Sequence, residues 1–162
     1  STTVDLVVKF LADGVLIVIL AVSGGALLFG TTTREKKAGY PYLIMAGLTS
    51  LLVGKLMSLL YQPEFARPFL EKGVQAGAAY IDNPGFPSDH ALLGTVAVLA
   101  VVVFVRHRML SIVLVTCLAL MCIARVLALV HTPLDVIGGI LAGLIGGVWY
   151  LRTHPASPKT QI

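Results

Sequence analysis

The sequence contains very little charge. Only 12% of its 162 residues are Asp, Glu, Lys or Arg, 57% are hydrophobic, and the mean hydropathy is +0.90. Soluble domains carry roughly 25% charged residues, so this balance excludes an ordinary soluble protein. Because a transmembrane helix needs about 20 apolar residues, the chain is long enough for a few spans and no separate soluble domain. We expect residues 1–162 to form a single integral membrane domain.

Cysteine is also scarce, and basic residues are not concentrated. Cys117 and Cys122 lie in one apolar run and lack the spacing of a metal or redox motif, so we interpret both as buried residues of a span. The net charge of +4 comes from Lys and Arg residues scattered between apolar runs, without a dense basic stripe. This distribution argues against a nucleic-acid partner and is typical of membrane topology signals.

Long apolar runs make up most of the chain. They predict an all-α integral membrane protein with five to six transmembrane helices in a bundle. Five spans can be placed directly, at residues 4–30, 42–61, 88–105, 109–127 and 133–151. Between them, residues 31–38 are expected to form a polar turn, with Pro41 in the first turn of the next helix. A short amphipathic helix is expected from Phe65 to Val74, lying on the membrane, and residues 153–162 should be a disordered tail.

Two spans have unusual patterns. Asp5, Lys9 and Asp13 recur every four residues in the first span, which predicts two opposite-charge pairs on one helical face. That face lies at the membrane interface, which we favour, or in the protein interior. In the last span, Gly139, Gly143 and Gly147 are spaced so that another helix can approach closely. This contact could be internal or between subunits, so the oligomeric state stays open.

The positions of the basic residues predict the topology. Three basic segments alternate with two loops of mixed charge, and they lie at residues 34–37, 106–108 and 152–159. The positive-inside rule places such segments in the cytoplasm. The loops at residues 62–87 and 128–132 then share the outer face, and they border most of the unusual polar residues of the chain.

The polar residues near that outer face suit a phosphate group. Lys55, Arg67 and Arg125 provide positive charge, and the two arginines provide planar donor groups. Ser88 precedes an apolar run as a helix cap, where backbone N–H groups and the helix dipole favour an anion. Asp89 could cap this helix or mark a diphosphate substrate.

Two histidines complete the predicted site. His131 and Asp135 are four residues apart at a helix start, so the carboxylate can fix the imidazole tautomer and leave the other ring nitrogen as a nucleophile. His90 is then available to protonate the leaving oxygen, which describes a metal-free phosphoryl transfer with no cofactor. The alternatives are separate structural roles for these residues, or a zinc site of His90, His131 and Asp135, which a neighbouring Arg125 disfavours.

In chain order these residues resemble the three-part signature of the type 2 phosphatidic acid phosphatase (PAP2) superfamily. The matching segments are Arg67-Pro68, Pro87-Ser88-Asp89-His90 and Arg125-x5-His131-x3-Asp135. Phe86, Asp89 and the Arg-Pro-Phe at 67–69 look most like bacterial undecaprenyl-diphosphate phosphatases. The chain departs from the pattern at Ala124, where serine is common, and in the wide separation of Lys55 and Arg67.

The resemblance implies a phosphohistidine on His131, with Asp135 as its partner and His90 as the acid. It also implies that Arg67, Ser88 and Arg125 bind the phosphate. We therefore expect a lipid phosphatase of a bacterial inner membrane that hydrolyses undecaprenyl diphosphate at the periplasmic face. Two alternatives stay open: a phosphatase for another lipid phosphate, such as phosphatidylglycerol phosphate, phosphatidic acid, a lipid A phosphate or a prenyl-phosphosugar, and a non-enzymatic lipid-phosphate binder.

Overall fold

A computed structural model describes residues 1–64 and 67–153, so the tail from residue 154 lies outside the described residues. All regular structure in this part is helical. The helices are α1 (Thr2–Lys9), α2 (Val15–Phe29), α3 (Thr33–Leu60), α4 (Pro68–Glu71), α5 (Asp89–Ala100), α6 (Arg108–Leu127) and α7 (Pro133–Gly146). A π-helical turn, Phe10–Gly14, joins α1 to α2, a second one, Val101–Val105, extends α5, and a 3₁₀ segment, Gly147–Arg152, extends α7.

The predicted all-α membrane bundle is confirmed. Within the described residues, four helical stretches are long and apolar enough to cross a membrane, and the stretch Asp89–Val105 is a shorter apolar helix. Large apolar side chains point outward, as shown by Ile17 at 69% and Leu59 at 70% exposure. The buried polar side chains are Ser23, Ser50, Arg67, Ser88, Thr95, Arg125, His131 and Asp135. An apolar exterior around polar groups is the distribution expected in lipid.

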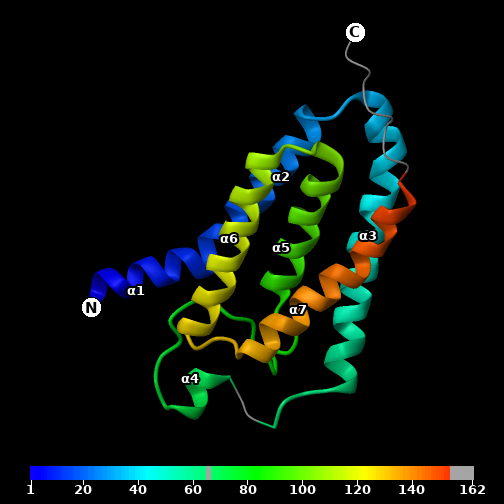
Figure 1. The fold of residues 1–162 in the computed structure, drawn as a ribbon. Helices are drawn as coiled ribbons and strands as arrows, with labels where there is room; N and C mark the ends of the chain where they lie inside the picture. Colours follow the sequence, from blue (N-terminus) through cyan, green and yellow to red (C-terminus); the bar gives the residue numbers. More distant parts are fainter. Residues whose placement is uncertain (65–66, 154–162) are drawn as a thin grey trace.

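Helices α2, α3, α5, α6 and α7 run alongside one another, while α1 projects away from them (Figure 1). The long loop with α4 lies at the same end of the bundle as the turn from α6 to α7. Two backbone bonds join these loops, from Phe69 N to Leu129 O at 3.0 Å and from Gly77 N to Ala128 O at 2.9 Å. The two loops that we expected on one face therefore lie together.

Glycines on α7 allow α5 and α3 to pack closely against it. A Cβ at Gly139 would meet Ser88 O of α5's cap, and one at Gly146 would meet Ser50 Oγ and Ala46 O of α3. The small-residue face thus makes a contact inside the chain. A larger residue at Gly139 would push apart the starts of α5 and α7, which carry the candidate site.

The second span begins earlier than predicted. Thr32 Oγ1 accepts from Glu35 N at 3.2 Å and Glu35 Oε2 accepts from Thr32 N at 2.6 Å, so a capping box starts α3 at Thr33. The expected polar turn at 31–38 is therefore mostly helix. Pro41 lies inside α3 instead of in its first turn, because the upstream cap supplies the helix start.

The amphipathic helix predicted from Phe65 to Val74 is only the four-residue α4, and residues 65–66 lie outside the described part. Phe69 is 5% exposed and packs in a protein cluster with Ala12, Ala124 and Val130. Gly73, with φ of 64°, lies two residues after the end of α4. The expected membrane-facing apolar stripe is thus interrupted, since its best apolar residue faces the protein.

Candidate active site

Five of the eight predicted site residues line one cavity of about 500 Å³ at the loop end of the bundle. These five are Arg67, Asp89, His90, Arg125 and His131. They come from the long loop, the start of α5, the end of α6 and the turn before α7. Ser88 and Asp135 lie behind this lining, whereas Lys55 is exposed on α3 and contributes nothing to the cavity wall.

The start of α7 holds His131 through a capping box. Thr132 Oγ1 accepts from Asp135 N at 3.2 Å, and Asp135 Oδ2 accepts from Thr132 N at 2.8 Å. The same Oδ2 lies 3.4 Å from His131 Nδ1. A carboxylate only accepts hydrogen bonds, so Nδ1 carries the proton and Nε2 keeps its lone pair. Burial lowers the pKa of His131, partly offset by Asp135 and reinforced by Arg125 and Arg67, which favours the neutral, nucleophilic imidazole.

Ser88 joins the two halves of the site. It is fully buried, its Oγ accepts from Ala91 N at 3.4 Å as the predicted cap of α5, and its N–H donates to Asp135 O at 2.8 Å. Asp89 is exposed and makes no side-chain hydrogen bond with described residues, so the capping alternative for Asp89 is not what the structure shows. The N–H groups of Asp89 and His90, in the first turn of α5, have no acceptor among the described residues and can bind an anion.

His90 is the second residue of α5 and is half-buried in the cavity wall. Its ring forms no hydrogen bond with another side chain or backbone group in residues 1–64 and 67–153. Both ring nitrogens are therefore available to a bound molecule, as an acid or a base requires.

Arg125 presents one free edge. Its Nη1 donates to Asp13 Oδ1 and to Ala79 O, each at 2.9 Å. The side chain is only 2% exposed, and its buried Nε has no hydrogen-bond partner among the described residues. A buried donor without a partner is costly, and the Nε–Nη2 edge of a guanidinium matches two oxygens of a phosphate. The free edge therefore suits an oxyanion.

Arg67 is held differently. Its guanidinium donates to Val130 O at 2.6 Å, to Ile81 O at 2.9 Å, and to Asn83 O and Oδ1 at 3.2 and 2.7 Å. These bonds use four of the five N–H donors of an arginine. Arg67 thus brings positive charge and at most one free donor to the cavity, while it fixes the loop around residues 81–83.

Sequence reasoning missed the role of Asp13. We expected it to pair with Lys9, but Lys9 is exposed and Asp13 pairs with Arg125, 112 residues away. The energies explain the choice: an exposed ion pair contributes about 0–1 kcal/mol, whereas leaving a buried charge unpaired costs roughly 3–5 kcal/mol. The spacing of Asp5, Lys9 and Asp13 signalled an interior option, but nothing in it identified the partner.

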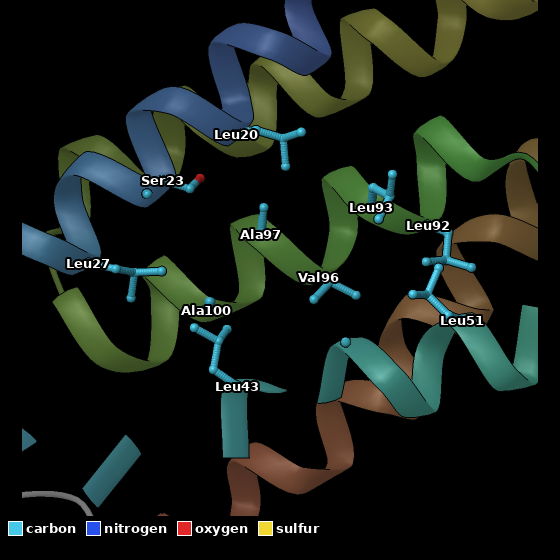
Figure 2. Close-up of a pocket in the computed structure, with 12 residues that line it drawn as sticks. Leu20, Ser23, Leu27, Leu43, Leu51, Leu92, Leu93, Val96, Ala97 and Ala100 are labelled. Atoms are coloured by element: carbon cyan, nitrogen blue, oxygen red, sulfur yellow. The ribbon is translucent and has the colours of Figure 1, made fainter. Parts of the chain in front are cut away.

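A second cavity of about 310 Å³ opens between α2, α3 and α5 (Figure 2). Its walls are leucine, valine and alanine side chains, with Ser23 as the polar exception, and the Ser23 hydroxyl has no partner among the described residues. Leu51 and Leu93 line this groove and also the polar cavity. The apolar groove therefore lies beside the candidate site. No group of three or more His, Cys, Asp or Glu side chains in the described part could hold a metal ion.

Comparison with known proteins gives consistent matches. The family model described as the PAP2 superfamily matches residues 37–159. The chain is 32% identical over 159 residues to the putative undecaprenyl-diphosphatase YbjG of Escherichia coli, covering 94% of this chain and 77% of that protein. It is 26% identical over 153 residues to the undecaprenyl-diphosphatase BcrC of Bacillus subtilis, covering 94% and 76%.

A further relative is the bacitracin transport permease protein BcrC of Bacillus licheniformis. It is 30% identical over 128 residues, which cover 77% of this chain and 60% of that protein. No solved structure matches the chain.

Proposed function

The chain belongs to the PAP2 superfamily, and from this premise we propose that it is a metal-independent lipid phosphatase that converts undecaprenyl diphosphate, or a similar polyprenyl diphosphate, to the monophosphate. The observation that carries the proposal is the pairing, in one cavity, of a tautomer-fixed His131 with the free edge of Arg125. A nucleophile beside an oxyanion site is the arrangement that phosphoryl transfer needs.

The proposed reaction has two steps. His131 Nε2 attacks the terminal phosphorus, the bond from phosphorus to the bridging oxygen breaks, and His90 protonates that oxygen, which leaves as the lipid monophosphate. Water then loses a proton to His90 and attacks the phosphohistidine. The P–N bond breaks, inorganic phosphate leaves, and His131 is neutral again. Arg125 and the first N–H groups of α5 stabilise the charge on the transferred oxygens, and Asp135 stabilises the imidazolium of His131.

The groove between α2, α3 and α5 supports a lipid substrate. It lies beside the polar cavity and is lined by apolar side chains, so a prenyl tail can occupy it while its diphosphate reaches Arg125. Asp89 is exposed at the cavity wall and is proposed to face the diphosphate. Lys55 is exposed on α3 outside the cavity wall, so we propose that it attracts the anionic substrate before the substrate enters the cavity.

We propose that this site faces the periplasm in a bacterial inner membrane. The basic residues at the start of α3 and at the start of α6 lie at the opposite end of the bundle from α4 (Figure 1). The positive-inside rule assigns such turns to the cytoplasm, and the similar proteins are bacterial.

Phosphate release by the purified full chain tests the function. We expect one phosphate per undecaprenyl diphosphate, unchanged by EDTA, because arginines and not a metal meet the phosphate oxygens. A panel with phosphatidic acid, phosphatidylglycerol phosphate, a lipid A phosphate and a prenyl-phosphosugar separates the substrates by kcat/KM. Loss of turnover in EDTA with recovery in Mg²⁺ would contradict the mechanism, and binding without turnover would identify a lipid-phosphate binder.

Filling the groove should impair long-tailed substrates selectively. A Cβ at Gly24 or Gly47 would meet nothing within 4 Å, and both residues line the groove, so leucine at either position enters its open space. For Gly24→Leu and Gly47→Leu we expect kcat/KM for the C55 diphosphate to fall about 10-fold or more, since several buried methylenes at about 0.8 kcal/mol each are displaced. A C15 diphosphate should be hydrolysed nearly as before.

Gly25→Leu is the matched control, because Gly25 is equally open but does not line the groove. It should leave both substrates unaffected. Equal losses on the C55 and C15 substrates in Gly47→Leu, or losses in Gly25→Leu as large, would show that the tail does not occupy this groove.

A further inference from the structure

Asp13 connects three parts of the chain at the candidate site. It lies in the π-helical turn Phe10–Gly14, and π turns occur frequently at functional sites. Its Oδ1 accepts from Arg125 Nη1 at 2.9 Å, and its two oxygens lie 3.2 and 3.0 Å from Ala79 N. Ala79 O in turn accepts from the same Nη1 at 2.9 Å. The carboxylate, one peptide group and one guanidinium nitrogen therefore form a closed set of contacts.

This set of contacts fixes which edge of Arg125 is free. Within residues 1–64 and 67–153, both hydrogen bonds of the guanidinium are made by Nη1, so the Nε–Nη2 edge is left for a ligand. Arg125 lines the cavity and Asp13 does not, so Asp13 holds the guanidinium from outside the cavity lining. An arginine without this contact could rotate about its side-chain torsions and lose the alignment that bidentate binding requires.

The same contact fixes the loop that holds Arg67. Ala79 is bound by Asp13 and Arg125, and two residues later Ile81 O accepts from Arg67 Nη2 at 2.9 Å. Both arginines of the cavity thus depend on the backbone between residues 79 and 83. Asp13 lies outside the region that matches the family model, which begins at residue 37.

We propose that Asp13 is a positioning residue of this site: it holds Arg125 by Nη1 and so directs the Nε–Nη2 edge toward the transferred phosphate. The inference rests on the proposed function. It predicts that Asp13 acts on the reaction through Arg125 and makes no contact with substrate.

The test is a double-mutant cycle on the chain of residues 1–162. Asp13→Ala should lower kcat by about 10- to 100-fold, as expected for a misplaced catalytic group, with a smaller change in KM. Asp13→Asn keeps one acceptor for Nη1 and should lose less. In an Arg125→Lys background, where the edge is already gone, Asp13→Ala should cost no more than about 3-fold. Asp5→Asn, on the exposed surface of α1, is the control and should behave as the wild type.

Binding of orthovanadate gives a readout without turnover. Orthovanadate resembles the transferring phosphoryl group and should protect the protein against thermal unfolding. Asp13→Ala should raise the orthovanadate dissociation constant obtained from this protection by about the factor lost in kcat. If Asp13→Ala does not fold, Asp13→Asn is carried through the same cycle.

Two results would overturn the proposal: a folded Asp13→Ala variant with wild-type kcat, or an equal fold-loss in the wild-type and Arg125→Lys backgrounds, which would assign Asp13 a purely structural role. A wild type that releases no phosphate counts against the proposed function instead. Orthovanadate binding then decides on Asp13 by itself, with unchanged protection in Asp13→Ala as the contradicting result.

Discussion

His131→Ala is expected to reduce phosphate release by at least about 10³-fold, because it removes the proposed nucleophile. His131 is 3% exposed, and its Nδ1 is held by Asp135 while its Nε2 forms no hydrogen bond with the described residues. Steady-state rates with the C55 diphosphate, measured beside thermal unfolding, separate lost chemistry from lost folding.

His107→Ala is the matched control. His107 lies in the basic turn between the π-helical segment Val101–Val105 and α6. Its Nδ1 accepts from Leu110 N at 3.1 Å and so caps the start of α6. Its loss should lower stability by about 1 kcal/mol and leave kcat unchanged. A His131→Ala protein that folds and keeps more than a few per cent of the wild-type rate would show that another group attacks phosphorus.

Arg125→Lys is expected to lower kcat/KM by about 10²- to 10³-fold, the usual cost of one oxyanion donor. Lysine retains the charge and can still pair with Asp13, but it has no second edge to present to the phosphate. The loss should therefore come from geometry and leave thermal stability nearly unchanged.

Arg67→Lys provides the contrast. Arg67 donates four hydrogen bonds to Val130, Ile81 and Asn83. Its replacement should therefore lower the unfolding temperature as well as the activity. Rates and unfolding temperatures of the two variants can be compared directly. An Arg125→Lys enzyme within about 3-fold of the wild type would contradict the assignment of the free edge to phosphate.

Local patterns indicated the helix starts that position the candidate site. The spacing of His131 and Asp135 places both on one side of a helix start, and Ser88 before an apolar run indicates a cap, so each is encoded within a few residues. Counting basic turns then placed the two loops at one end. These features are short-range, and the structure brings them together at one end of the bundle, with Ser88 N bonded to Asp135 O beside the cavity that His131 lines.

Long-range pairing was not predictable in the same way. The partner of Asp13 depends on how a π turn and α6 pack, which no local pattern encodes. Lys55 resembled a phosphate ligand by charge alone, but its place on α3 leaves it exposed and outside the cavity wall. The predicted second span began near Pro41, because proline is common in the first turn of a helix. The capping box at Thr32 starts α3 at Thr33 instead.

Trapping the phosphorylated protein tests the central claim most directly. The full chain is mixed briefly with undecaprenyl diphosphate labelled in its terminal phosphate, denatured in alkali, and examined for protein-bound label. The mechanism predicts label that survives alkali, is lost in acid, maps to the peptide containing His131, and is absent from His131→Ala. Turnover without any bound label, or label that persists in His131→Ala, would contradict it.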